Sequence, residues 1–251
     1  MTNIIMVGCN GHMGQVISEL VRADEDAVIA AGIDIVDNRD NGYPVFTSIM
    51  DCDVPADVII DFSSVNQLEE RLEYAKLHKT PIVLCTTGLS KEQVALVEET
   101  SKSIAVLRSA NMSLGINTLM KLVAEAAKVL AAEGFDVEVV EKHHNQKLDA
   151  PSGTALALAD SVNEAMDNQY EYIYDRSGRK MKRDKKELGI SAVRGGSIVG
   201  EHDVIFAGPD EVVTFSHTAY SKAIFGKGAI AAAKYLKGKE PSLYDMSDVI
   251  G

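Results

Sequence analysis

The hydrophobic residues in the first half of the chain form short runs that alternate with helix-like segments. The runs lie at residues 3–7, 28–33, 58–62, 81–84 and 104–107, and their lengths are typical of buried strands. Helices are expected between them at residues 15–22, 67–78 and 90–101, the last capped by Ser90. Strands that alternate with helices predict an α/β domain with a parallel, doubly wound sheet.

The second half of the chain shows a different pattern. Residues 117–132, 154–166 and 223–236 are rich in alanine and other small or apolar residues and predict helices, whereas residues 135–140, 190–194, 198–206 and 211–217 predict strands. Glycine turns join the last three strands, and these connections are too short for helical crossovers, so we expect antiparallel pairing. This pattern indicates an α+β domain with an open mixed sheet. Such a sheet commonly packs against a copy of itself, which predicts an oligomer.

Residues 175–186 form a basic run that is rich in turn-forming residues. A solvated loop is the favoured interpretation, because a run of charges usually faces water. The alternative is a mobile loop with a functional role.

A glycine-rich turn follows the first predicted strand. Gly8, Gly11 and Gly14 are spaced as G-x-x-G-x-x-G between a strand and a helix, which is the setting that dinucleotide binding requires. We expect Gly8 to allow the tight turn, Gly11 to admit the pyrophosphate, and Gly14 to let helix and strand pack closely. The second strand ends at Asp34, about 20 residues further on, where an acid binds the ribose. Together these features favour a Rossmann-like, dinucleotide-binding domain over a plain connecting turn.

The residues beside Asp34 bear on which dinucleotide is used. A carboxylate there favours a free 2′-hydroxyl and repels a 2′-phosphate. Ile35 and Val36 stand where an NADP-preferring site usually has a basic residue, although Arg39 lies a little further on. The sequence therefore predicts that NADH is used at least as well as NADPH.

Small polar residues follow three of the predicted strands. They lie at residues 63–64, at residues 86–88, and at Asn111 and Ser113. Each could be an ordinary turn, but parallel strands present their carboxyl ends at one edge of the sheet, where ligands bind. Their repetition favours a cofactor lining.

Charge and cysteine content narrow the class of protein. The net charge of −12 argues against general binding to nucleic acid or to an anionic membrane. Three scattered cysteines, Cys9, Cys52 and Cys85, fit a reducing compartment rather than a disulfide framework. No stretch is long enough to span a membrane, and the N-terminus resembles a strand rather than a secretory signal. We therefore expect a globular, cytoplasmic protein.

The densest group of candidate catalytic residues lies at residues 141–155, between a predicted strand and a predicted helix. His143 and His144 can exchange protons near neutral pH, and Lys147 offers a positive charge or a proton. Pro151 suits the first turn of a helix, so the following backbone N–H groups should form an anion site. These groups suit a small carboxylate substrate that is protonated during the reaction.

Two other interpretations of this segment are open. It could be a solvated loop followed by a capped helix. A zinc site is the less favoured alternative, because His143 and His144 are adjacent and have no cysteine or acid at ligand spacing. We expect no metal.

The segment 141–155, E-K-H-H-N-Q-K-L-D-A-P-S-G-T-A, resembles the signature E-x-H-H-x-x-K-x-D-x-P-S-G-T-A of the 4-hydroxy-tetrahydrodipicolinate reductase family. The resemblance runs along the whole chain, because the segments at residues 8–14, 85–88, 110–113, 194–202 and 243–246 follow in family order. It implies reduction of 4-hydroxy-tetrahydrodipicolinate by NAD(P)H, with loss of water, on the route to lysine and diaminopimelate.

The resemblance also implies two domains and an oligomeric state. A dinucleotide-binding domain would comprise residues 1–113 and 221–251, and residues 114–220 would form the substrate-binding and tetramerisation domain. The protein would be a homotetramer.

Carried over by position, the family's site residues fall as follows. His143 is the proton donor and acceptor, and Lys147 is a second proton donor. His144 and the backbone amides of Gly153 and Thr154 bind the substrate carboxylates. The cofactor lining comprises Gly8, Cys9, Asn10, Gly11, His12, Met13, Asp34, Cys85, Thr86, Thr87, Ala110, Asn111, Met112 and Ser113.

Two positions depart from the family pattern. Many members have glycine where Cys85 stands, so its side chain either crowds the nicotinamide or points away. Many also have arginine where this chain has Ile35. The lack of that arginine argues against a preference for the phosphate-bearing cofactor, NADPH. Two other functions compete with the reductase: a different amino-acid or semialdehyde dehydrogenase on the same architecture, and a dinucleotide sensor without catalysis.

Overall fold

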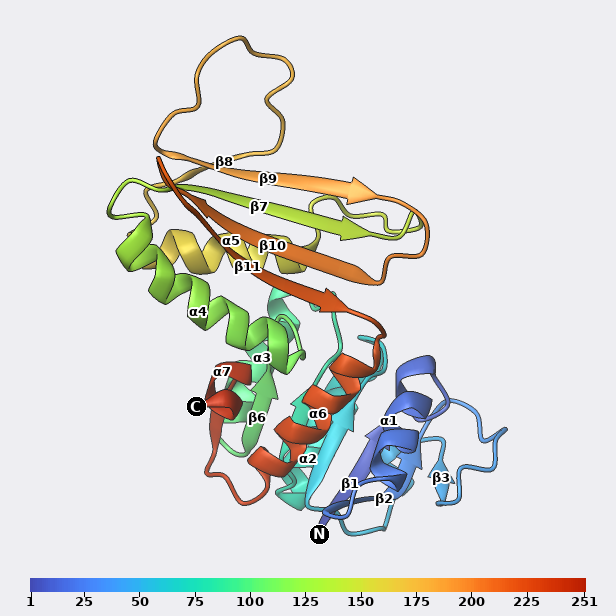
Figure 1. Ribbon diagram of the computed structural model, residues 1–251. Helices are drawn as coiled ribbons and strands as arrows, with labels where there is room; N and C mark the ends of the chain where they lie inside the picture. The colour runs from blue at the N-terminus through green and yellow to red at the C-terminus, as the bar shows by residue number, and fades with distance from the viewer. The chain divides into compact units, whose positions relative to one another are not determined.

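The computed structural model describes residues 1–251, which divide into two compact units (Figure 1). The first unit comprises Met1–Leu114 and Ala223–Gly251, and the second comprises Gly115–Lys222. The chain therefore builds the first unit from two separate stretches of sequence. No helix is both long enough and apolar enough to cross a bilayer.

The first unit is built on a seven-stranded sheet in which every pairing is parallel. The strand order is β12-β6-β5-β4-β1-β2-β3. The strands are β1 (Thr2–Val7), β2 (Ala27–Ile33), β3 (Val45–Phe46), β4 (Val58–Asp61), β5 (Ile82–Leu84), β6 (Ala105–Arg108) and β12 (Ser242–Tyr244). The helices are α1 (His12–Arg22), α2 (Leu68–His78), α3 (Lys91–Ser101), α6 (Ala223–Leu236) and α7 (Met246–Ile250), with a short 3₁₀ turn at Ile49–Asp51.

Helices cover both faces of this sheet, because successive side chains of a strand point to opposite sides. Ile4 and Met6 of β1 enter a core that also contains residues of α1 and α6. Ile5 and Val7 enter the opposite core, formed with α2 and α3. The predicted doubly wound parallel sheet is confirmed.

Several element boundaries differ from the sequence predictions. α1 begins at His12 rather than near residue 15, since Gly11 is the N-cap and Gly14 already lies in the first turns. Ser90 caps α3 as predicted, with Gln93 completing a reciprocal capping box. The edge strands β3 and β12 were not predicted, because runs of two or three residues carry no readable periodicity.

The second unit contains a five-stranded mixed sheet in the order β11-β10-β7-β9-β8. Its core on one face joins the sheet to α4 and α5, through residues such as Val123, Val139 and Leu158 (Figure 1). The side chains of β7 accordingly alternate between half-buried and buried. The elements are β7 (Asp136–His143), β8 (Glu171–Ile173), β9 (Glu187–Arg194), β10 (Gly200–Ala207), β11 (Val212–Ala219), α4 (Leu114–Leu130) and α5 (Gly153–Ala165).

The predicted antiparallel pairing is right for only part of this sheet. β10 pairs antiparallel with β11 and with β7, but β9 pairs parallel with β7 and with β8. β7 lies between β9 and β10, so the short connection between those two strands crosses the end of a third strand. Connection length fixed the relative direction of β9 and β10, but it could not show that another strand separates them.

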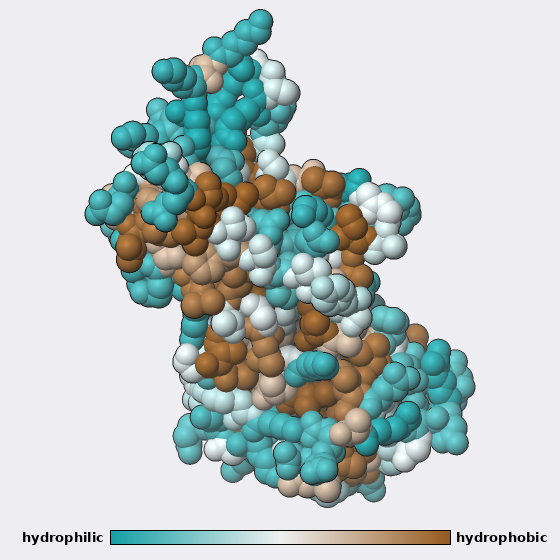
Figure 2. All heavy atoms as spheres, in the orientation of Figure 1, coloured by the Kyte–Doolittle hydropathy of each residue, from teal (hydrophilic) through white to brown (hydrophobic).

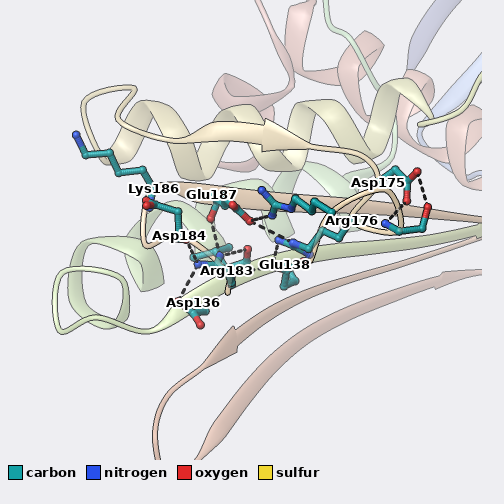
Figure 3. Close-up of polar contacts among 11 residues, drawn as sticks. Asp136, Glu138, Asp175, Arg176, Arg183, Asp184, Lys186 and Glu187 are labelled. Atoms are coloured by element: carbon teal, nitrogen blue, oxygen red, sulfur yellow. Dashed lines mark hydrogen bonds and ion pairs between the residues drawn. The ribbon is translucent and has the colours of Figure 1, made fainter. Parts of the chain in front are cut away.

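The basic run 175–186 is anchored by its arginines (Figure 3). Arg176 makes two hydrogen bonds to Glu138, at 2.9 and 2.7 Å. Arg183 bonds Glu138 at 2.9 Å and Asp136 at 2.8 Å, and Arg179 pairs with Glu187. The lysines of the run stay exposed, and Figure 2 shows the projecting segment as mostly hydrophilic. The solvated-loop interpretation is therefore right for the lysines and wrong for the arginines.

Candidate active site

His143 is the last residue of β7 and is buried, not part of the loop as its sequence position suggested. β7 extends three residues beyond its predicted end. Glu141 and His143 are two residues apart and so point to the same face of the sheet. That is the face that α5 covers, because buried positions alternate along the strand up to His143.

The carboxylate of Glu141 is fully buried and accepts four hydrogen bonds. Oε2 lies 2.5 Å from His143 Nδ1 and 2.8 Å from Arg194 Nη1. Oε1 accepts from Arg194 Nη2 at 2.7 Å and from the backbone N–H of Ser152 at 3.1 Å. Burial alone raises the pKa of Glu141, but hydrogen bonds from Arg194, His143 and Ser152 outweigh it and lower the pKa below its usual value. The group is therefore an ionised acceptor.

Two further histidines extend this row across the sheet. The ring of His202 on β10 lies edge-on to that of His143, with centroids 5.1 Å apart, and His217 on β11 lies beyond it at 6.5 Å. Burial, followed by the nearby His143, lowers the pKa of His202 to about 4, and burial also lowers the pKa of His217. His202 is therefore neutral near pH 7.

α5 begins beside these rings. Ser152 is its N-cap, and its hydroxyl accepts from the N–H of Ala155 and lies 3.2 Å from His202 Nε2. Gly153 is exposed and opens the first turn, where backbone N–H groups attract anions. Pro151 was expected in that turn, but it lies before the cap, after a cis peptide bond.

The connecting loop holds the remaining cationic candidates. Lys147 Nζ lies 2.8 Å from Asp149, and this hydrogen bond is the main reason that the pKa of Asp149 is lowered. His144 is half-buried, and its carbonyl accepts the backbone N–H of Lys147. The structure thus brings the catalytic and substrate-binding candidates, residues 143–154, to one strand end and the adjoining helix start. It places no group of three or more histidine, cysteine or acidic side chains where a metal ion could bind.

The glycine turn of the first unit fits a dinucleotide. Gly8 has a φ of +80°, and a Cβ there would lie 2.9 Å from the carbonyl oxygen of Phe62. Gly14 has no room for a Cβ against the backbone of Gly8 and Cys9. Asp34 accepts the backbone N–H of Asn10 at 2.8 Å, which places the predicted ribose acid beside the turn. A hollow beside it is lined by Gly8, Asp34, Ile35, Ser48, Ser63 and Arg71.

Three residues of the predicted cofactor lining direct their side chains into the core. Cys9 and Met112 are buried, and Cys85 packs against the same core cluster. Burial and the charge of Asp34 raise the pKa of Cys9 to about 11, and burial raises that of Cys85 well above its usual value. Elsewhere in the predicted lining, Thr86, Asn111 and Ser113 are buried, whereas Gly11, His12, Thr87 and Ala110 are exposed and Met13 is half-buried.

Sequence reasoning missed Glu141, Arg194 and His202 as members of the site. Glu141 was detectable, since a strand places residues two apart on one face. Arg194 and His202 lie in the segment 194–202, which resembles the family in sequence. Only the pairing of β9 and β10 with β7 brings them close to His143.

Comparison with known proteins matches both units. The dihydrodipicolinate reductase N-terminal and C-terminal family models match residues 2–112 and 115–250. A 4-hydroxy-tetrahydrodipicolinate reductase of Caldanaerobacter subterraneus subsp. tengcongensis is 50% identical over 100% of this chain and 98% of its own length. One of Clostridium tetani is 48% identical over 98% of this chain and 96% of its own.

Solved structures share the fold. A dipicolinate-bound dihydrodipicolinate reductase from Paenisporosarcina sp. TG-14 superposes with a TM-score of 0.82 at 23% identity, covering 98% of this chain and 97% of that one. A probable dehydrogenase from Thermotoga maritima gives a TM-score of 0.60 at 14% identity, covering 99% and 92%. Matching models over both units and full-length relatives near half identity establish that this chain belongs to the dihydrodipicolinate reductase family.

Proposed function

We propose that the protein reduces (2S,4S)-4-hydroxy-2,3,4,5-tetrahydrodipicolinate with NAD(P)H, with loss of water, to (S)-2,3,4,5-tetrahydrodipicolinate in lysine and diaminopimelate biosynthesis. The observation that carries the proposal is the meeting of His143, Lys147 and the N-terminus of α5 at one end of β7. The names of full-length relatives support the same reaction. Another dehydrogenase is less favoured, because the dehydrogenase from Thermotoga maritima that shares the fold is only 14% identical, against 50% for the reductase of Caldanaerobacter subterraneus subsp. tengcongensis.

Each site residue has a chemical part in this proposal. A bound nicotinamide supplies a hydride, and the reduced ring of the substrate then needs a proton. His143 supplies that proton, and Lys147 is the second donor. His144 and the backbone N–H groups of Gly153 and Thr154 bind the two carboxylates, since a helix N-terminus and cations both stabilise negative charge.

For the cofactor, we propose that NADH is used at least as well as NADPH. Asp34 lies beside the glycine turn, where a carboxylate disfavours a 2′-phosphate. The next residue, Ile35, is 78% exposed and offers no positive charge. We retain the rest of the cofactor lining proposed from the sequence, although the side chains of Cys9 and Met112 lie in the core.

We further propose a cytoplasmic homotetramer. The sheet of the second unit is covered by α4 and α5 on one face, and alternate residues of its edge strand β11 are exposed. A second copy of the chain is the partner that such a sheet face fits. The three cysteines form no disulfide, which is compatible with a reducing compartment.

The experiment that tests the reaction is a coupled assay. A synthase would make the substrate from pyruvate and aspartate semialdehyde, and the oxidation of NADH or NADPH would be followed by absorbance. Wild-type protein should turn over, and His143→Gln should lose about 10²–10⁴-fold in kcat while still binding cofactor. Cofactor binding without turnover by the wild type would exclude the reductase and favour a dinucleotide sensor.

A further inference from the structure

We propose that Glu141, held by Arg194, is the positioning residue for His143: it keeps the proton of the neutral imidazole on Nδ1 and stabilises the imidazolium, so that Nε2 takes up a proton from solvent and then passes it to the substrate. This inference rests on the proposed reductase function. Neither Glu141 nor Arg194 touches the reacting atoms in it, since both act through the His143 ring.

The carboxylate of Glu141 is buried among hydrogen-bond donors. Glu141 has no exposed surface, and all its neighbours within hydrogen-bond reach other than His143 are obligate donors. Arg194 and the N–H of Ser152 can only donate, and an ionised carboxylate can only accept. The 2.5 Å contact to His143 Nδ1 therefore requires that Nδ1 carries the proton.

The other ring nitrogen of His143, Nε2, lies against a glycine. Gly200 faces it from β10, and a Cβ at that residue would lie only 3.1 Å from His143 Nε2. The missing side chain leaves Nε2 without a steric block on that side. The ionisable groups around the ring are Glu141 on β7, Arg194 on β9 and His202 on β10, and Lys147 on the following loop acts electrostatically on the neighbouring His202.

Glu141 also links the imidazole to the anion site. The Glu141 carboxylate that bonds His143 also accepts the backbone N–H of Ser152, the N-cap of α5. One group thus fixes both the proton donor and the turn that presents Gly153 and Thr154. A substitution of Glu141 that removes the acceptor for the Ser152 N–H should therefore raise the KM for substrate as well as lower kcat. Glu141→Gln, which keeps that acceptor, and His143→Gln should act mainly on kcat.

Replacing Glu141 by glutamine should reverse the tautomer. The Oε1 position faces two obligate donors, Arg194 Nη2 and Ser152 N–H, so the amide oxygen belongs there. The amide NH₂ then occupies the Oε2 position and donates to His143 Nδ1, which moves the ring proton to Nε2. Arg194 Nη1 keeps a partner, because it also bonds the carbonyl of Val193.

The test is ¹⁵N NMR of histidine-labelled protein at a pH where the His143 ring is neutral. The chain has six histidines, and the spectrum of His143→Gln assigns the signal. Wild type should show protonated Nδ1 and bare Nε2, Glu141→Gln the reverse, and Glu141→Asp a partial return to the wild-type pattern. The matched control is Asp160→Asn, which changes a carboxylate that bonds only the Tyr172 hydroxyl and should leave the signal unchanged.

Kinetics complete the test. Glu141→Gln should lower kcat by about 10²–10⁴-fold, as loss of a general acid does, while Asp160→Asn should retain wild-type kcat. A wild-type ring protonated on Nε2 would overturn the proposal, and that result requires no variant to fold. A Glu141→Gln variant that keeps the wild-type tautomer would overturn it too. Because the tautomer is read without substrate, failure of the reductase assignment would appear separately, as wild-type protein without turnover.

Discussion

Ile35 is the residue on which cofactor choice is expected to depend. It follows Asp34 at the end of β2 and is largely exposed, so a longer side chain fits without disturbing the core. Ile35→Arg should raise kcat/KM for NADPH about 10-fold, because one charge-assisted contact to a 2′-phosphate is equivalent to about 1.4 kcal/mol. Steady-state kinetics with both cofactors measure this change. Equal improvement with NADH would contradict the assignment, since NADH has no 2′-phosphate.

His202 should make the stability of the fold depend on pH. Its pKa is about 4 in the fold and 6.5 ordinarily, so the unfolded chain binds a proton that the folded chain does not. The neutral ring makes its complete contribution to the free energy of unfolding above pH 6.5, and this contribution is lost as the pH falls toward 4. Between pH 7 and pH 5 this loss amounts to about 2 kcal/mol.

Urea unfolding at the two pH values tests the role of His202. The free energy of unfolding of the wild type should fall about 2 kcal/mol further than that of His202→Gln, which keeps a polar group near Ser152. The same fall in both proteins would show that another group is responsible.

The sequence revealed the proposed reactive residues but not the groups that surround them. His143, His144 and Lys147 lie within five residues of one another, so a local pattern reveals them. Arg194 and His202 are more than 50 residues from His143 and meet it only through strand register. A sequence read on its own contains no signal for that register.

The arginines of the 175–186 segment act at the scale of the element. Arg183 bonds the carboxylates of Asp136 and Glu138 and three backbone carbonyls, and its side chain is 18% exposed. Arg183→Met should lower the free energy of unfolding by about 1–3 kcal/mol, since its charge-assisted hydrogen bonds to Asp136 and Glu138 are lost. Amide hydrogen exchange in residues 175–186 should rise at the same time.

A neighbouring lysine provides the control for this element. Lys182→Met removes a charge from the same segment, but Lys182 is exposed, so neither exchange nor stability should change appreciably. Equal effects of the two substitutions would mean that net charge, and not the arginine contacts, holds the segment.

Long elements were predictable and short or non-local ones were not. α6 begins and ends where its alanine-rich pattern predicts, and α2 agrees within one residue. β3, β8 and β12 have two or three residues each and depend on neighbours for their hydrogen bonds. β9 was placed three residues too late because its first half includes Glu187 and Gly189, which do not resemble a strand until Arg176 and Glu138 are seen beside them.

Assembly is the prediction at the scale of the whole molecule. Sedimentation velocity should give a particle of four chains, each of 27.1 kDa. Val212→Arg adds a charge to the edge strand β11 and should shift the protein to smaller species, since a buried unpaired charge disfavours an interface. Val129→Arg is the matched control, because that valine is as exposed but lies on α4. If Val212→Arg forms tetramers as stable as those of the wild type, β11 is not part of the subunit interface.

The central claim is that this chain transfers a hydride to a cyclic dicarboxylate, with His143 as the proton donor. Its most direct test is mass spectrometry of the product formed with NADH that carries deuterium at the transferred C4 position. Wild-type protein should give tetrahydrodipicolinate with one deuterium on the ring, and His143→Gln should form it about 10²–10⁴-fold more slowly. Product without deuterium, or cofactor bound with no product formed, would contradict the account.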